Sequence, residues 1–102
     1  MKTSIIIPCY NEKNSIRETV ESIWAIIQES QLNNVEIIAV NDGSTDGSEH
    51  VLSALAAECT TGNLIVVHHK RNQGYGAALK TGLRRSQSCL LYTSDAADES
   101  VG

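Results

Sequence analysis

Three short segments hold the residue types that could bind a phosphorylated nucleotide. They run from Pro8 to Glu12, from Asn41 to Gly47 and from Arg71 to Gly76. Their carboxylates and amides could hydrogen-bond a base and a ribose. The ring of Tyr10 could stack on either. Their glycines let backbone N–H groups come close to a phosphate. Together the three segments favour nucleotide binding.

Asp42 is the most informative of these residues. It leaves an apolar run as a carboxylate that could accept an imide or amidine N–H from a nucleobase, and Gly43 lets the backbone turn beside it. The alternative is an Asx turn in which Ser44 and Asp46 only cap the next helix. For Asp46 we favour this capping role.

The first segment offers Tyr10 and Glu12. Tyr10 could stack on a base or ribose, or it could pack as an ordinary loop aromatic. Glu12 could bind ribose hydroxyls, or it could be a solvated acid near the start of a helix. These alternatives stay open on the sequence alone.

The third segment could hold a phosphate. Gly74 and Gly76 precede or open a helical pattern, and Arg71 supplies charge. The third glycine of the dinucleotide fingerprint is missing, and Gly43 to Ser48 lacks the lysine of a P-loop, so both of those motifs are excluded. We assign no chemistry to the two neighbouring histidines, His68 and His69.

Alternating strand and helix patterns position these segments. Apolar runs predict strands at residues 4–8, 35–40 and 64–68, each followed by a helical pattern, of which the first ends near Gln31. Runs that are apolar throughout are typical of parallel strands covered on both faces. We expect a three-layer α/β fold, a mainly parallel sheet with helices on both faces, with the segments at its carboxyl edge. The residues expected to face inward from the third helix are Tyr75, Ala78, Leu79 and Leu83.

The strings IIIPCYNE, IIAVNDGSTDGS and NQGYGAALKTGL resemble, in order and spacing, the three amino-terminal signatures of family 2 glycosyltransferases. The resemblance covers residues 3 to about 86. It implies part of a nucleotide-diphosphosugar transferase domain of the GT-A type, and an inverting enzyme as the full-length protein. The third string is most similar to polyprenyl-phosphate hexosyltransferases, including dolichol-phosphate mannose synthases. This implies a nucleotide-diphosphate sugar as donor and a lipid phosphate or hydroxyl as acceptor.

The resemblance also implies a donor site. Pro8, Tyr10 and Glu12 would line the base and ribose, and Asp42 would read the base. Asn41 departs from the family's commoner paired aspartates. The full set that we assign to the donor nucleotide is Pro8, Tyr10, Asn11, Glu12, Asp42, Asn72 and Gly74.

The family's acidic metal motif and its general base would lie beyond residue 88. A divalent cation, Mg²⁺ or Mn²⁺, is expected in the full-length protein to neutralise the leaving diphosphate. Asp95 and Asp98 have one residue too many between them for the usual DxD motif. We therefore assign no catalytic residue and no metal ligand in this chain, and expect it to be inactive alone.

Residues 89–99, CLLYTSDAADE, resemble the conceptual translation of a sequencing-library adapter. We expect residues 1–88 to be the nucleotide-sugar-binding part of a GT-A domain and residues 89–102 to be a non-native tail. The alternative is a genuine fourth strand over 90–93 with an acidic loop after it. Without Asp95, Asp98 and Glu99, nine acids face eight bases, so the net charge of −4 comes mostly from this tail.

Composition excludes several classes of function. No broad basic surface exists for nucleic acid, and no apolar run approaches the roughly 20 residues of a membrane span. Three cysteines without CxxC spacing argue against a disulfide framework or a zinc site. We expect a cytoplasmic protein, with the parent on the cytoplasmic face of a membrane if it is attached to one. The alternative function is a stand-alone nucleotide-binding module without catalysis.

Overall fold

The computed structural model describes residues 3–31, 34–59, 63–86 and 90–93. Strands and helices alternate, as the sequence predicts. Helix α1 ends two residues before the expected Gln31. Residues 90–93 form a fourth strand, which is the alternative interpretation to a non-native tail. The elements are β1 (Thr3–Cys9), α1 (Ile16–Glu29), β2 (Val35–Asp42), α2 (Ser48–Glu58), β3 (Leu64–His69), α3 (Tyr75–Arg85) and β4 (Leu90–Thr93).

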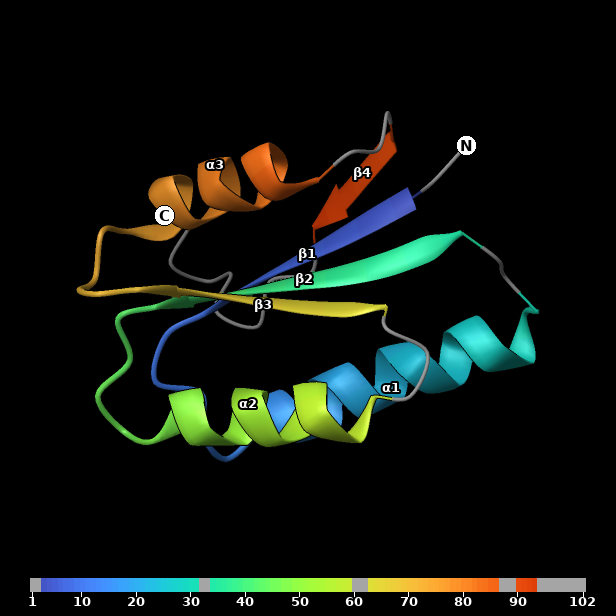
Figure 1. The fold of residues 1–102 in the computed structure, drawn as a ribbon, viewed down its shortest axis with the longest axis horizontal. Coiled ribbons are helices and arrows are strands. Elements are labelled where there is room, and N and C mark those ends of the chain that lie inside the picture. The colour runs from blue at the N-terminus through green and yellow to red at the C-terminus, as the bar shows by residue number, and fades with distance from the viewer. Residues whose placement is uncertain (1–2, 32–33, 60–62, 87–89, 94–102) are drawn as a thin grey trace.

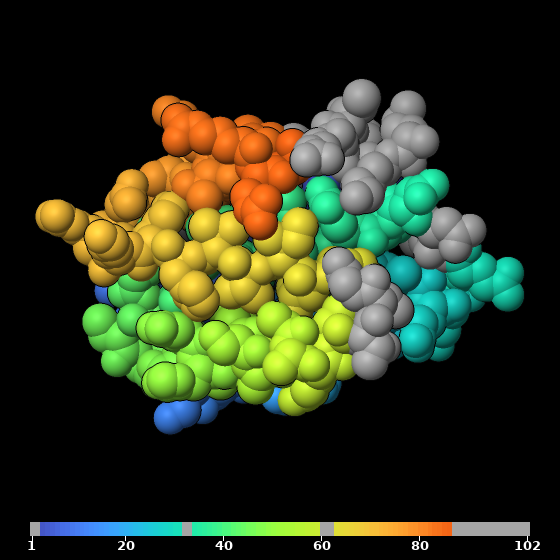
Figure 2. Space-filling model, in the orientation of Figure 1, coloured from blue at the N-terminus to red at the C-terminus, as the bar shows by residue number. Residues whose placement is uncertain are grey.

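The four strands form one parallel sheet in the order β3-β2-β1-β4. Helices α1 and α2 lie on one face and α3 on the other (Figure 1). The predicted three-layer arrangement is therefore confirmed. In the space-filling view the edge strand β3 runs between α3 and α2 (Figure 2). None of the helices in the described residues is long and apolar enough to cross a membrane.

Alternation along β2 sends successive side chains to opposite faces of the sheet. Ile37 and Ala39 are fully buried in the core under α1 and α2. Ile38 and Val40 are fully buried in the smaller core under α3. Because both faces are covered, the middle of the strand from Ile37 to Val40 is apolar on both sides, and the same alternation sends Asn41 and Asp42 in opposite directions where the strand ends.

Helix α3 lies on the sheet through its small residues. Ala78 and Gly82 are buried, and a Cβ added to Gly82 would come within 2.5 Å of Ile6 Cγ2. The prediction that Tyr75 and Leu83 face inward is wrong, since they are 38% and 47% exposed. Leu83 follows Gly82 and so lies about 100° further around the helix, and Tyr75 belongs to the first turn.

Candidate functional site

The three segments identified in the sequence meet at the carboxyl edge of the sheet. Loop 1 (residues 10–15) follows β1, loop 2 (43–47) follows β2 and loop 3 (70–74) follows β3. They lie together at the left of Figure 1, where the sheet's strands end. Parallel strands bring the loops to one edge, which is where open α/β sheets bind ligands.

Asn11 joins loop 1 to loop 2. Its backbone N–H donates to Ser44 Oγ at 2.9 Å, and its Oδ1 accepts the Thr45 N–H at 2.8 Å. Asn11 has a φ of 54°, a left-handed conformation that asparagine tolerates better than most residues. The residue is exposed, so its side chain holds the loops together at the surface of the site.

Asp46 and Ser48 make a second connection between these loops. Asp46 Oδ1 accepts both the N–H and the hydroxyl of Ser48, and its Oδ2 accepts the Lys13 N–H at 3.0 Å. The Ser48 hydroxyl oxygen in turn accepts the Glu12 N–H at 3.0 Å. The hydrogen bond from Ser48 is the main reason that the pKa of Asp46 lies below its ordinary value. Asp46 thus bonds the first residue of α2, whose N-cap position is occupied by Gly47.

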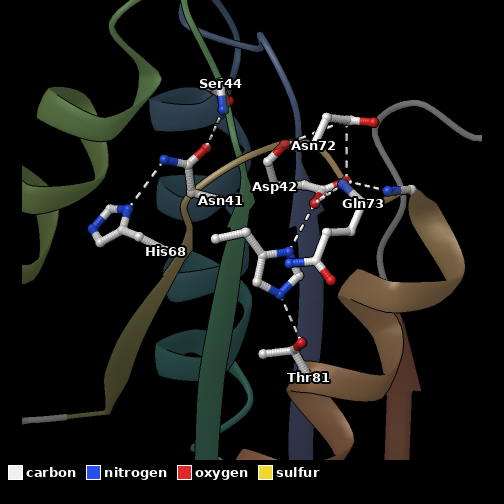
Figure 3. Close-up of polar contacts among 9 residues, drawn as sticks. Asn41, Asp42, Ser44, His68, Asn72, Gln73 and Thr81 are labelled. Atoms are coloured by element: carbon white, nitrogen blue, oxygen red, sulfur yellow. Dashed lines mark hydrogen bonds and ion pairs between the residues drawn. The ribbon is translucent and has the colours of Figure 1, made fainter.

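Asp42 joins loop 2 to loop 3 through a carboxylate whose side chain is only 5% exposed. Its Oδ1 accepts from His69 Nδ1 at 2.7 Å and from the Gln73 N–H at 2.9 Å. Its Oδ2 accepts from Asn72 Nδ2 at 3.1 Å and from the Gly74 N–H at 2.9 Å (Figure 3). Each oxygen therefore has two donors, which fills the acceptor capacity of the carboxylate.

The two histidines after β3 take part in the same network, a role that sequence reasoning missed. His69 Nε2 lies 2.7 Å from Thr81 Oγ1 of α3, and His68 Nδ1 lies 3.0 Å from Asn41 Nδ2 (Figure 3). Asn41 also accepts the Ser44 N–H at 3.1 Å, so it donates and accepts at once, which an aspartate cannot do. The strand register, which pairs 41 with 68 and 42 with 69, is the signal that could have found these contacts.

Gly43 is required by the close approach of loops 2 and 3. Its φ is +73°, and a Cβ there would overlap the backbone of Arg71 and Asn72. The turn after Asp42 therefore excludes any other residue without movement of loop 3. This explains how one carboxylate can reach backbone amides of the neighbouring loop.

The remaining residues that the sequence assigned to the donor site differ in their exposure. Tyr10 is 45% exposed and Asn72 is exposed, so both can reach a ligand. Pro8 is buried near the end of β1. The half-buried Glu12 accepts the Ser15 hydroxyl at 2.8 Å, and Gly74 directs its N–H to Asp42.

Within the described ranges, no group of three or more histidine, cysteine, aspartate or glutamate side chains could hold a metal ion. Both oxygens of Asp42 accept from donors of the chain itself, and no second carboxylate in the described part of the chain stands beside it in a metal-binding group. Asp95 and Asp98 lie outside the described residues. The residues described here do not fit the divalent cation expected from the sequence.

The loops and their order can now be compared with known proteins. The family model described as "Glycosyl transferase family 2" matches residues 4–100. The chain belongs to glycosyl transferase family 2. An uncharacterized glycosyltransferase of Rickettsia bellii is 42% identical over 81 residues, which are 79% of this chain and 11% of that protein. An undecaprenyl-phosphate 4-deoxy-4-formamido-L-arabinose transferase of Sodalis glossinidius is 38% identical over 96 residues, or 93% of this chain and 28% of that one.

Two solved structures are similar to this chain in fold. The mannosyltransferase PcManGT of Pyrobaculum calidifontis, in complex with GDP-Man and Mn²⁺, matches 93% of this chain and 27% of its own, with a TM-score of 0.83 and 27% identity. S. aureus TarS 1-349 in complex with UDP matches 94% of this chain and 27% of its own, with a TM-score of 0.76 and 23% identity, and supports the fold alone. The predicted GT-A type of fold is confirmed.

This chain spans 11% and 28% of the length of the two curated relatives named above. It corresponds to one part of a family 2 glycosyltransferase domain.

Proposed function

We propose that this chain forms the donor-nucleotide part of an inverting glycosyltransferase that transfers a hexose from a nucleotide-diphosphate sugar to a lipid phosphate or hydroxyl. The observation that carries the proposal is the joining of three family segments at one sheet edge by side chains of loops 1, 2 and 3. The relative named for undecaprenyl phosphate supports a polyprenyl phosphate as acceptor. The match to a GDP-Man complex supports a nucleotide-sugar donor.

The donor nucleotide would lie across loops 1 and 2, with loop 3 beside it. Tyr10, which is half-exposed, stacks on the base or ribose, and Glu12 bonds the ribose hydroxyls in exchange for Ser15. The buried Pro8 lies just before loop 1, and the exposed Asn11 holds loop 1 against loop 2, so both shape this side of the nucleotide site. Gly74 keeps loop 3 close to the carboxylate that reads the base.

Asp42 can read a base only if one of its four donors leaves. Three of them are held in place, because two are backbone N–H groups and the third is the buried ring of His69. The fourth is the exposed side-chain amide of Asn72, which rotation can move away from Oδ2. We infer that the base N–H takes the place of the Asn72 amide, which then turns to the nucleotide.

The divalent cation and the general base of the reaction belong to residues other than those described here. The chain by itself supplies binding and orientation of the nucleotide. We expect it to show no transfer activity by itself, because the described residues contain no group of side chains that could hold the metal ion.

Titration calorimetry with uridine and guanosine diphosphates tests this assignment on the 102-residue chain. Loss of the charged acceptor in Asp42→Asn should weaken binding of the preferred nucleotide about tenfold or more, since a charge-assisted hydrogen bond contributes on the order of 2 kcal/mol. Asn72→Ala should weaken it much less, because the base replaces that contact. Failure of both nucleotides to bind the folded wild-type chain would remove the proposal.

A further inference from the structure

We propose that His69 is a positioning residue for the donor site, and that Thr81 fixes the tautomer in which it acts. The inference rests on the proposed function, because the group that His69 positions is the Asp42 carboxylate. It adds to that function a connection from the site to helix α3.

The hydrogen bonds determine which ring nitrogen carries the proton. A carboxylate only accepts, so the 2.7 Å contact between Asp42 Oδ1 and His69 Nδ1 requires a hydrogen on Nδ1. In the neutral ring Nε2 is then an acceptor, and it receives the hydroxyl of Thr81 at 2.7 Å. The two contacts thus select one tautomer of a ring whose side chain is 9% exposed.

The position of His69 in the fold explains what this arrangement does. His69 is the last residue of β3 and the register partner of Asp42 in β2, while Thr81 lies in the second turn of α3. The ring therefore bridges the sheet and the helix, since its Nδ1 contacts Asp42 of β2 and its Nε2 contacts Thr81 of α3. Its two hydrogen bonds hold the ring from both sides.

The consequence concerns the orientation of the carboxylate. His69 and the Gln73 N–H both bond Oδ1, whereas Oδ2 is held by the Gly74 N–H and by the exposed Asn72 amide. Oδ1 thus faces fixed donors, and Oδ2 is the oxygen that a base can reach when Asn72 leaves. Without the His69 ring, Asp42 loses one of the two contacts that keep Oδ1 turned inward.

The first measurement is of the ring nitrogens, by ¹⁵N–¹H correlation NMR on the unliganded full chain at neutral pH. We expect a hydrogen on Nδ1 and none on Nε2 of His69. This is a signature that simple packing of the ring would not fix, since an unconstrained imidazole exchanges between both forms. A hydrogen on Nε2 would overturn the inference.

The second measurement is nucleotide affinity. His69→Ala should weaken binding roughly five- to tenfold through loss of a charge-assisted contact. His69→Asn, whose amide N–H can take the place of Nδ1–H, should restore it to within about twofold. Thr81→Val should weaken binding about threefold, because the ring then lacks the hydroxyl that donates to Nε2. Thr81→Ser retains that hydroxyl and should retain the affinity. The exposed histidine His50 of α2 supplies the matched control, His50→Ala, which should bind like wild type.

The outcomes separate the two proposals. If the wild type binds and the folded His69→Ala variant binds equally well, His69 has no positioning role and the donor site stands. If the folded wild type binds neither nucleotide, the proposed function fails and this inference falls with it. Weakening in His69→Ala with rescue by His69→Asn supports both.

Discussion

Two aspartates four residues apart show how neighbouring carboxylates acquire different roles. Asp42 ends the buried strand β2 and accepts from His69 of β3 and from three donors of loop 3, whereas Asp46 lies just before α2 and bonds Ser48 and Lys13. The sequence predicts base reading for Asp42, which stays a prediction, and capping for Asp46, whose Oδ1 accepts the Ser48 N–H although Gly47 occupies the N-cap position. The donors that fill Asp42 could not be predicted, because they come from residues 69–74, about 30 positions away.

Asp46 should make the stability of the chain sensitive to acid. Its pKa is lowered in the folded chain, so its contribution is complete above the unfolded value near 4 and is lost as the pH falls toward the folded value. The free energy of urea unfolding should therefore differ between wild type and Asp46→Asn at pH 6, and this difference should shrink by pH 3. Ser48→Ala, which removes the principal donor but keeps the carboxylate, is the matched variant and should reduce the same pH dependence. An unchanged difference between the two pH values would contradict the assignment.

Cys9 should be chemically inert while the chain is folded. Burial of Cys9 at the end of β1 raises the pKa of its thiol to about 11 from an ordinary value of 9.0, so the thiolate fraction at pH 8 falls roughly a hundredfold. Iodoacetamide followed by peptide mass mapping should label the half-buried Cys59 well before Cys9. In urea the two should react alike, and equal rates under native conditions would contradict this prediction.

At the scale of elements, the sequence predicts the order of strands and helices because the apolar runs and helical stripes are local. The loop-to-loop contacts could not be predicted in the same way, since they depend on register and on close approaches such as Gly43 against Arg71 and Asn72. The inner face of helix α3 is predicted only in part. Ala78 and Leu79 pack in the core as expected, but Tyr75 is exposed, and so is Leu83, which lies about 100° around the helix from the buried Gly82.

The contact between α3 and β1 predicts opposite effects for two glycines of one helix. Gly82→Ala places a methyl group 2.5 Å from Cγ2 of the fully buried Ile6, and overpacking of this kind costs about 1–3 kcal/mol, more than the gain of up to ~1 kcal/mol in helix propensity. Gly76→Ala meets nothing within 4 Å and should stabilise the chain by about 0.5–1 kcal/mol. Urea unfolding of both variants gives the comparison. Stabilisation by both would show that α3 does not lie against Ile6.

At the scale of the whole molecule, the described sheet has β3 and β4 at its two edges, and several large apolar side chains are exposed. Ile26 is 58% exposed on α1 and Leu83 is 47% exposed on α3. Open strand edges and exposed apolar groups favour association between copies. We expect the 102-residue chain to be marginally stable and to form larger species as its concentration rises in sedimentation velocity. A monomer that unfolds in one cooperative transition at all concentrations would contradict this expectation.

Residues 89–102 give the last prediction, which concerns how much of the chain belongs to the folded unit. Residues 90–93 pair in parallel with residues 3–6, and a short apolar segment such as LLYT can pair in this way whatever its origin. If this strand forms in solution, its amides should be protected from hydrogen exchange, and a chain ending at Ser88 should lose on the order of 2 kcal/mol from the missing ladder hydrogen bonds. Ser86→Ala within the full chain controls for a change at the end of α3 alone. Unprotected amides and equal stability of the shorter chain would instead support our expectation that residues 89–102 are a non-native tail, since β1 would then need no partner beyond β2.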